Sequence, residues 1–196
     1  MKIAIIDYKA GNTASIKNAV ENLGFSCIIT NNPEEILKAD GVIFPGQGRA
    51  GQAMKNLKEM GIDKILSRIT KPFLGICLGM QLLADSSEED NTKCLSIVGG
   101  KCIKFPAELK TPQIGWNKVN FIQPSPITEE IKNGSYFYFA NSYYIEVENK
   151  YIVGKTDYGI NFSSIIQKDN YFAIQFHPEK SGTVGSQLLN NFCKLC

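Results

Sequence analysis

The sequence predicts an α/β fold with a mainly parallel central sheet flanked by helices, and with antiparallel strands added in the second half. The 196 residues suffice for one sizeable domain, and a hydrophobic share of 43% suits a globular core. Strand and helix patterns alternate in the first half, whereas short strand-like runs follow one another in the second half. We find no linker or internal repeat and expect a single domain over residues 1–196.

The first half of the chain alternates apolar strand-like runs with helical patterns. Ile16, Ala19, Val20 and Leu23 recur at helical spacing before the stop signal at Gly24. Because a helix separates each strand from the next, we expect right-handed crossovers and parallel pairing. The expected strands are 2–7, 25–30, 41–46 and 72–77, and the expected helices are 12–24, 33–39, 52–70 and 78–85.

The pattern changes after residue 86. The polar stretch SSEEDN (86–91) is typical of a loop, and the short alternating runs beyond it are divided by turn-forming residues. Such runs indicate hairpins or antiparallel additions to the same sheet. We expect strands at 96–105, 114–122, 136–148, 151–156, 163–167 and 171–176, and a closing helix at 185–196.

Composition and charge argue against several function classes. The formal net charge is +2 and the only arginines are Arg49 and Arg68, so the chain has no dense basic patch for nucleic acid. The apolar run at the N-terminus is short and contains Asp7, unlike a signal peptide. No stretch approaches the roughly 18 apolar residues of a membrane span. We expect a cytoplasmic protein with its six cysteines reduced.

The C-terminal cysteine pair indicates core packing rather than a metal site. Cys193 and Cys196 form a CxxC, but no second pair has matching spacing and the chain has one histidine. We expect this pair to face the core from the last helical turn. The strand-like apolar settings of three further cysteines predict small core side chains, namely Cys27, Cys94 and Cys102.

The stretch GICLG places Cys77 between an expected strand and an expected helix, with Gly75 and Gly79 on either side. A G-x-C-x-G turn in this position has the geometry of a nucleophile elbow. The following helix N-terminus favours a thiolate, and the N–H of Leu78 would point to a developing oxyanion. The alternative is a structural cysteine in a glycine-rich turn, and this stretch alone leaves the two equally supported.

The stretch QFHPEKSG (175–182) contains the only histidine, His177, with Glu179 two residues later. A thiol nucleophile needs a general base, and that base needs a third group to orient its ring. A lone histidine is more often a surface or satisfied core residue. Beside a cysteine elbow in an α/β chain, a catalytic pair becomes the favoured interpretation.

A third glycine-rich stretch, FPGQGRAG (44–51), follows the expected strand at 41–46. Gly46 and Gly48 permit unusual backbone dihedral angles and exposed N–H groups, which would suit a second oxyanion donor. The alternative is an ordinary turn between a strand and a helix. The stretch lacks the Gly-Lys-Ser/Thr ending of a phosphate-binding loop.

In this order, PGQG, GICLGMQ and HPE resemble the class I (triad) glutamine amidotransferases, and the likeness spans nearly the whole chain. The family has a flavodoxin-like α/β fold. Within it, IDYKAGNTASIKNAV, PQIGWNKV, YFANSYY and HPEKSG are similar to the glutaminase subunits of histidine biosynthesis. These hydrolyse L-glutamine and deliver ammonia to a cyclase barrel subunit that makes imidazole glycerol phosphate and AICAR. The resemblance therefore implies a heterodimer and neither a cofactor nor a metal.

The resemblance also implies a role for each matching residue. Cys77 would form a γ-glutamyl thioester, with His177 as general acid and base and Glu179 orienting its imidazole. The oxyanion hole would use the N–H of Leu78 and a peptide N–H of the segment Gly46, Gln47 and Gly48. The substrate-binding positions would be Gln81, Asn141, Ser142 and Tyr143.

Contacts with the cyclase, near the passage of ammonia, are implied for Asn12, Trp116, Asn117, Tyr138 and Lys180. A tryptophan is more commonly a core anchor, and a lysine is commonly a plain surface residue. The GWN context of Trp116 favours the interface.

The chain departs from the family pattern at two positions. Asn141 stands where histidine is usual, and asparagine cannot titrate. Gln47 replaces a small aliphatic residue, which could alter how readily that peptide reorients.

Three other functions stay open at the level of sequence. A paralogous glutaminase could feed a different barrel-type partner, for example in cell-surface sugar synthesis. A non-catalytic subunit could keep the fold and the partner surface, and a stand-alone cysteine hydrolase could act on glutamyl peptides. The last of these would show high turnover without a partner.

Overall fold

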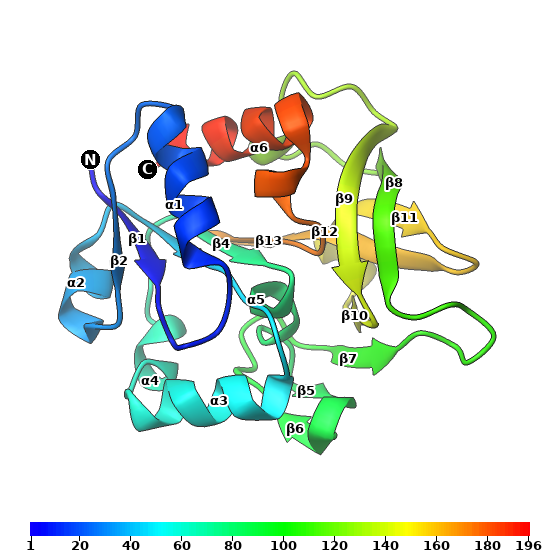
Figure 1. The fold of residues 1–196 in the computed structure, drawn as a ribbon, viewed down its shortest axis with the longest axis horizontal. Helices are drawn as coiled ribbons and strands as arrows, with labels where there is room; N and C mark the ends of the chain where they lie inside the picture. Colours follow the sequence, from blue (N-terminus) through cyan, green and yellow to red (C-terminus); the bar gives the residue numbers. More distant parts are fainter.

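The computed structural model describes residues 1–196 and shows a long central sheet with helices on both faces (Figure 1). One side of this sheet is parallel, in the order β2, β1, β3, β4 and β13. Most residues of these strands are buried, as the apolar runs of a doubly covered parallel sheet should be. The strands are β1 (Ile3–Ile6), β2 (Cys27–Thr30), β3 (Gly41–Phe44), β4 (Phe73–Ile76) and β13 (Tyr171–Ile174).

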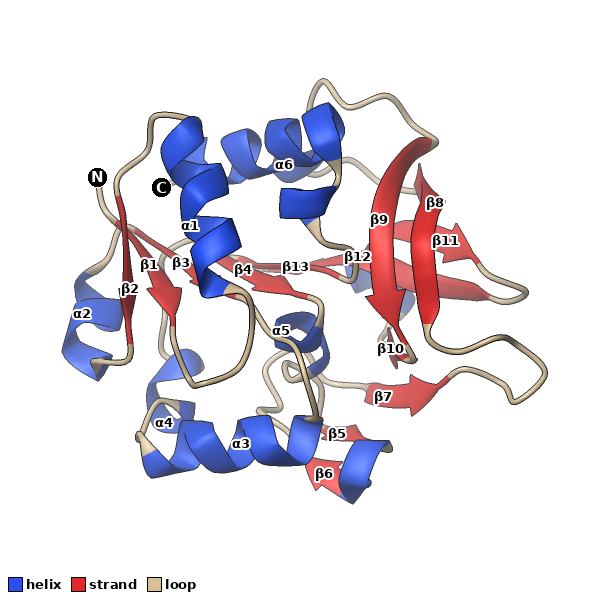
Figure 2. Ribbon diagram, in the orientation of Figure 1, coloured by secondary structure: helices blue, strands red, loops and turns tan.

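Helices enclose the parallel strands from two sides (Figure 2). The helices α1 (Thr13–Asn22) and α6 (Gly182–Lys194) share one hydrophobic cluster with the sheet. The helices α2 (Pro33–Lys38), α3 (Ala50–Glu59) and α4 (Asp63–Leu66) belong to a second cluster. Because strand side chains alternate, Ile5 lies in the first cluster and Ile6 in the second.

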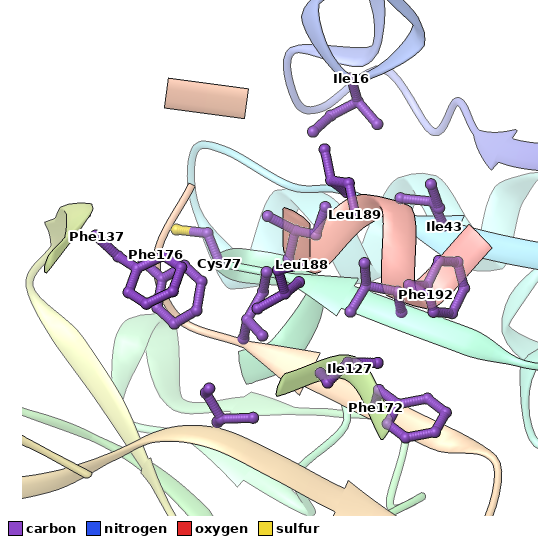
Figure 3. Packing of buried hydrophobic residues seen from close by; sticks show 14 of the residues in the cluster. Ile16, Ile43, Cys77, Ile127, Phe137, Phe172, Phe176, Leu188, Leu189 and Phe192 are labelled. Atoms are coloured by element: carbon purple, nitrogen blue, oxygen red, sulfur yellow. The ribbon is translucent and has the colours of Figure 1, made fainter. Parts of the chain in front are cut away.

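The remaining strands pair mostly antiparallel and extend the sheet beyond β13. They are β12 (Asn161–Lys168), β10 (Tyr143–Glu146), β7 (Lys101–Lys104), β5 (Ser86–Ser87) and β6 (Thr92–Lys93). The strand β11 (Ile152–Asp157) joins β12 to a ribbon of β8 (Gln113–Phe121) and β9 (Ser135–Asn141). Phe137 of this ribbon stacks on Phe176, with ring centroids 4.0 Å apart (Figure 3).

The predicted mixed α/β fold is confirmed, but several expected elements differ from the structure. The helix expected at 52–70 is two helices, α3 and α4, because the chain turns at Gly61, whose φ is 69°. The strand at 171–176, expected among the antiparallel additions, pairs in parallel with β4 as β13.

The helix expected at 78–85 is only α5 (Leu78–Gln81), because the Asp85 N–H then donates to the Gly100 carbonyl and draws the chain toward β7. The loop expected at 86–91 contains β5 and the 3₁₀ turn η1 (Glu89–Asn91). The run 136–148 is two strands, since β9 pairs with β8 while β10 pairs with β7 and β12.

The expected core cysteines are buried, with one exception. Cys27, Cys94, Cys102 and Cys193 are each at most 7% exposed, whereas Cys196 at the chain end is partly exposed. Three further 3₁₀ turns connect the elements: η2 (Pro126–Thr128), η3 (Asn149–Tyr151) and η4 (Pro178–Lys180). No helix combines the length and the apolar character that crossing a membrane requires.

Candidate active site

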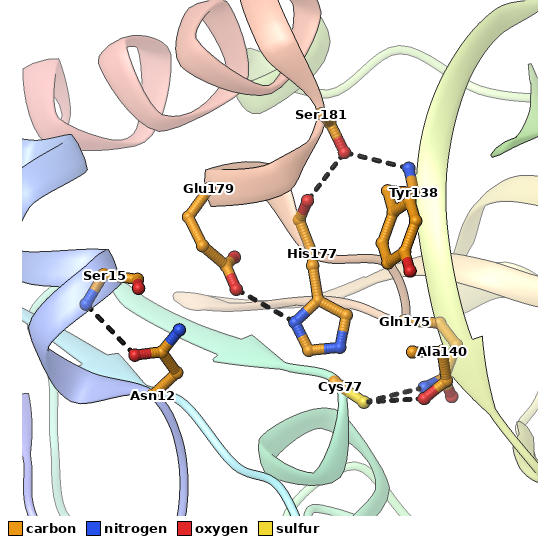
Figure 4. Close-up of polar contacts among 9 residues, drawn as sticks. All are labelled: Asn12, Ser15, Cys77, Tyr138, Ala140, Gln175, His177, Glu179 and Ser181. Carbon is orange, nitrogen blue, oxygen red and sulfur yellow. Dashed lines mark hydrogen bonds and ion pairs between the residues drawn. The ribbon is translucent and has the colours of Figure 1, made fainter. Parts of the chain in front are cut away.

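Three adjacent parallel strands bring the three glycine- and histidine-containing stretches together. The strands β3, β4 and β13 are neighbours, with Phe44 opposite Gly75 and Ile76 opposite Ile174. Each stretch therefore leaves the sheet at its carboxyl edge, where open α/β sheets bind ligands. Figure 4 shows the resulting group, with Cys77 beside His177 and Glu179 behind the imidazole.

Cys77 occupies a strained backbone conformation at the turn between β4 and α5. Its φ of 54° and ψ of −110° lie in a region that residues with side chains rarely adopt. The Cys77 N–H donates to the Ile174 carbonyl at 2.8 Å, and the Cys77 carbonyl accepts from the Gln81 N–H at 3.1 Å. These bonds hold the bend, so the thiol projects from it as a nucleophile elbow requires.

The glycines around Cys77 are required by close backbone packing. A Cβ on Gly79 would lie 1.9 Å from the Phe44 carbonyl oxygen, and one on Gly46 would lie 2.3 Å from the Tyr8 hydroxyl oxygen. That hydroxyl donates to the Pro45 carbonyl at 2.9 Å. Because these positions lack a Cβ, the end of β3 packs directly against the turn at Cys77, and the PGQG segment lies beside the thiol.

His177 and Glu179 form a buried pair. The His177 Nδ1 lies 3.0 Å from the Glu179 Oε1, and the two side chains are 4% and 3% exposed. The other ring nitrogen is thus free to face the thiol, and Glu179 can fix the ring orientation. The second carboxylate oxygen, Oε2, is buried without a hydrogen-bond partner.

The environment of the His177 imidazole favours its protonated form. Burial is the strongest single influence and opposes the charge, but hydrogen bonds to Cys77 and Glu179 and the charges of both outweigh it. Together they raise the pKa of His177 to about 10. An imidazolium at neutral pH can stabilise a thiolate and later donate a proton.

A pocket of about 380 Å³ opens beside Cys77, a size suited to a small molecule. Glu89 is the only acidic residue in its lining. Gly46 lies instead in a second, small pocket of about 10 Å³, together with Asn12, His177 and Glu179. The predicted residues that line the larger pocket are Gln47, Gly48, Cys77, Leu78, Gln81, Asn141, Ser142, Tyr143, His177 and Lys180.

The segment expected to supply an oxyanion donor is anchored at both ends. Gly48 has a φ of 94°, in the region that favours glycine. Beyond it, the Ala50 N–H at the start of α3 donates to Glu89 Oε2 at 2.7 Å. Gln47 and Gly48 line the pocket together with Leu78, the first residue of α5.

Several predicted substrate-binding groups are occupied by other protein groups. The Tyr143 carbonyl accepts from Gln81 Nε2 at 2.9 Å and from Asn141 Nδ2 at 3.0 Å. A contact from Tyr143 to a substrate would therefore not use this oxygen. Asn141 is 4% exposed, and its hydrogen bond to the Tyr143 carbonyl links the end of β9 to the start of β10. Its Oδ1 is buried without a partner.

Three of the residues expected at a partner interface, Trp116, Tyr138 and Lys180, form a cluster at the η4 turn, in which Trp116 and Lys180 are exposed and Tyr138 is half-buried. Trp116 is 56% exposed, so the alternative of a core anchor is wrong. Its ring meets Tyr138 edge-on at 6.2 Å, and Lys180 Nζ lies 5.7 Å from the centroid of the same Tyr138 ring.

Asn12 and Asn117 serve local structure as well. The Asn12 Oδ1 caps α1 by accepting from the Ser15 N–H at 3.3 Å. The Asn117 Nδ2 donates to the Asp157 carbonyl at 2.8 Å, so its amide ties the β8–β9 ribbon to the end of β11.

Three further residues of the site, Gln175, Ser181 and Glu89, were not predicted from the sequence. Gln175 is fully buried with its Nε2 3.6 Å from Cys77 Sγ, and it lies two residues before His177 on an extended stretch. That spacing puts both side chains on one face and could have revealed it. The Ser181 hydroxyl donates to the His177 carbonyl at 2.6 Å and accepts from the Tyr138 N–H at 3.0 Å. Glu89 came from an expected loop and had no sequence signal.

Comparisons with known proteins agree with this architecture. The sequence model of class-I glutamine amidotransferases matches residues 4–196. The chain is 51% identical to the imidazole glycerol phosphate synthase subunit HisH of Methanocaldococcus jannaschii, over 98% of this chain and 99% of that protein. The same subunit of Desulfovibrio desulfuricans is 44% identical, over 99% and 94%. The crystal structure of a glutamine amidotransferase shares the fold, with a TM-score of 0.76 at 16% identity, over 98% and 97%.

Proposed function

The chain belongs to the class-I glutamine amidotransferase family, and on that premise we propose that it is the glutaminase subunit of an imidazole glycerol phosphate synthase. It hydrolyses L-glutamine and passes the ammonia to a cyclase barrel subunit in histidine biosynthesis. The observation that carries this proposal is a cysteine elbow and a buried His–Glu pair at one pocket, in a chain 51% identical to such a subunit over its full length.

The first half of the reaction forms a thioester and releases ammonia. The Cys77 thiolate attacks the carboxamide carbon, and the oxygen gains the charge beside the Leu78 N–H and a peptide N–H of the Gly46–Gln47–Gly48 segment. The His177 imidazolium then gives its proton to the nitrogen, the carbon–nitrogen bond breaks, and ammonia departs. Because its pKa is raised, the His177 imidazole is protonated at neutral pH and can donate this proton.

The second half releases glutamate. The now neutral His177 takes a proton from a water molecule, whose oxygen attacks the thioester carbon. The carbon–sulfur bond breaks, and the thiolate and imidazolium are restored as glutamate leaves. Glu179 keeps the ring aligned through both steps because its Oε1 lies 3.0 Å from Nδ1.

The charged ends of glutamine can be matched to the pocket lining. Glu89 suits the α-ammonium group, since it is the only lining carboxylate. Both N–H groups of the Gln81 amide are used within the protein, which leaves its Oε1 to accept from the substrate. Ser142 and Tyr143 lie beside it, with the Tyr143 carbonyl excluded as described above.

The proposed route for ammonia leads past His177 toward the partner. His177 and Gln47 line both the larger pocket and the small pocket that also contains Asn12. The small pocket has room for about one water-sized molecule, and ammonia is of that size. We propose the cluster of Trp116, Tyr138 and Lys180 as a cyclase contact.

A coupled assay tests this proposal. Glutamate formation should be low for the chain alone, should rise when the cyclase subunit and its ligand are added, and should vanish in Cys77→Ala. The wild-type gene should also rescue a histidine auxotroph that lacks its glutaminase subunit. Turnover without rescue would favour a different barrel partner, and absence of turnover in the complex would indicate a non-catalytic subunit.

We also propose that residues 1–196 act as one glutamine amidotransferase domain. The family match over residues 4–196 and the continuous sheet support this organisation. Denaturant unfolding followed by fluorescence and circular dichroism should give one shared transition. Two separated transitions would contradict it.

A further inference from the structure

A chain of hydrogen bonds leads from a backbone carbonyl to the nucleophilic sulfur. The Tyr143 carbonyl accepts from Gln81 Nε2 at 2.9 Å, and the same nitrogen donates to Gln175 Oε1 at 3.1 Å. Gln175 Nε2 in turn lies 3.6 Å from Cys77 Sγ. Gln81 is 6% exposed and Gln175 is fully buried, so water has little access to this chain.

The direction of this chain is fixed by chemistry. The Tyr143 carbonyl can only accept, so Gln81 must turn its NH₂ group toward it. The second N–H of that group needs an acceptor, and Gln175 Oε1 supplies it. Rotating the Gln175 amide by half a turn would set two NH₂ groups against each other. The amide nitrogen of Gln175 therefore faces the sulfur.

We propose that Gln175 is a further catalytic residue, whose amide N–H stabilises the Cys77 thiolate, and that Gln81 is the positioning residue that orients this amide. The proposal rests on the glutaminase function above. A hydrogen bond to the charged form of a group favours that form. The Ala140 carbonyl, 4.0 Å from Cys77 Sγ, can accept from a thiol S–H and so favours the uncharged form.

Gln175 suits this role because an amide cannot titrate. A lysine at this position could take up or release a proton and so interfere with the proton that His177 gives to ammonia. Glutamine donates a hydrogen bond but does not ionise. The Gln175 amide can turn either its oxygen or its nitrogen toward the sulfur, so a neighbouring residue must fix its orientation. Only a neighbour with a fixed donor, here Gln81, can keep the amide nitrogen on the sulfur side.

Alkylation of Cys77 by iodoacetamide tests the proposal, because only the thiolate reacts and no glutamine is needed. The rate is followed by mass spectrometry of the Cys77 peptide between pH 5 and 9. In Gln175→Met, which has similar volume and no donor, we expect alkylation about tenfold slower at neutral pH. The matched control is Gln167→Met on β12, which removes an amide whose oxygen accepts from the Ser125 hydroxyl, and it should leave the rate unchanged.

A second variant keeps the test decisive if Gln175→Met unfolds. The four other buried cysteines, Cys27, Cys94, Cys102 and Cys193, report unfolding, because they become alkylated when the core opens. Gln81→Met leaves Gln175 in place without its orienting donor and should slow Cys77 alkylation by an intermediate factor. Rates within twofold of wild type in a folded Gln175→Met, or in Gln81→Met if the first variant unfolds, would overturn the proposal.

Turnover separates this inference from the proposed function. In the complex with the cyclase, Gln175→Met should lower kcat about tenfold with little change in KM, because it acts on the thiolate rather than on substrate binding. A wild-type complex without turnover would remove the proposed function, while the alkylation rates would still decide the role of Gln175. Normal turnover together with unchanged alkylation in Gln175→Met would remove the inference alone.

Discussion

Replacing Cys77 with alanine should lower the pKa of the His177 imidazole. In the wild type, hydrogen bonds to Cys77 and Glu179 overcome burial and raise this pKa to about 10. A neighbouring opposite charge shifts a pKa by about 1–3 pH units. Alanine removes the sulfur and its charge but leaves the buried Glu179 in place. We therefore expect the pKa of His177 to fall by about 1–3 pH units, or roughly 1.4–4 kcal/mol of preferential stabilisation of the imidazolium.

The chain is unusually well suited to this measurement because His177 is its only histidine. With isotope-labelled histidine, an NMR titration gives one imidazole signal. The sign of the effect is fixed: a raised pKa keeps the ring protonated at higher pH, and removing the negative partner lets the proton leave earlier. Cys94→Ala, which removes a buried thiol from the other hydrophobic cluster, is the control and should titrate as the wild type does. The same titration midpoint in wild type and Cys77→Ala would show that Cys77 does not raise the pKa of His177.

Three further outcomes follow from the packing, the pocket and the proposed cyclase contact. Gly79→Ala should destabilise the fold by about 3 kcal/mol in denaturant unfolding, since its Cβ would lie 1.9 Å from the Phe44 oxygen. The control Gly51→Ala should cost much less, because its Cβ would meet only side-chain atoms, with Asp90 nearest at 3.1 Å. Glu89→Gln should raise KM for glutamine roughly tenfold with kcat nearly unchanged, and an unaltered KM would exclude it from binding the ammonium group. Trp116→Ala should weaken cyclase binding roughly 30-fold by calorimetry, and unchanged affinity would place the interface elsewhere.

Local sequence patterns predicted the parts of the site that depend on local conformation. A strand, a bend between two glycines and a helix define the elbow at Cys77, and all three signals lie within a few residues. His177 and Glu179 are equally local, because one short turn, η4, sets their spacing. Alternation of strand and helix patterns predicted the parallel pairing of the first-half strands. It did not predict the place of β13, because the run at 171–176 was expected among the antiparallel additions and instead pairs in parallel with β4, which brings His177 to Cys77.

The parts that could not be predicted depend on contacts between distant segments. Glu89 reaches the pocket only because η1 folds against the start of α3, where it accepts from the Ala50 N–H. The early end of α5 also depends on a contact between distant segments, because the hydrogen bond from the Asp85 N–H to the Gly100 carbonyl directs the chain toward β7. Gln175 could be predicted only in part. Its spacing of two residues from His177 is visible in the sequence, whereas its hydrogen bond with Gln81 joins distant segments and is visible only in the structure.

A glutamine-analogue electrophile tests whether Cys77 is the nucleophile of a glutaminase. The reagent is applied to the complex with the cyclase subunit and its ligand, and the labelled residue is identified by mass spectrometry. We expect one label for each chain, on Cys77 and on none of the five other cysteines, with loss of glutamate formation in step with labelling. Glutamine hydrolysis by a complex whose Cys77 stays unlabelled would contradict this role of Cys77.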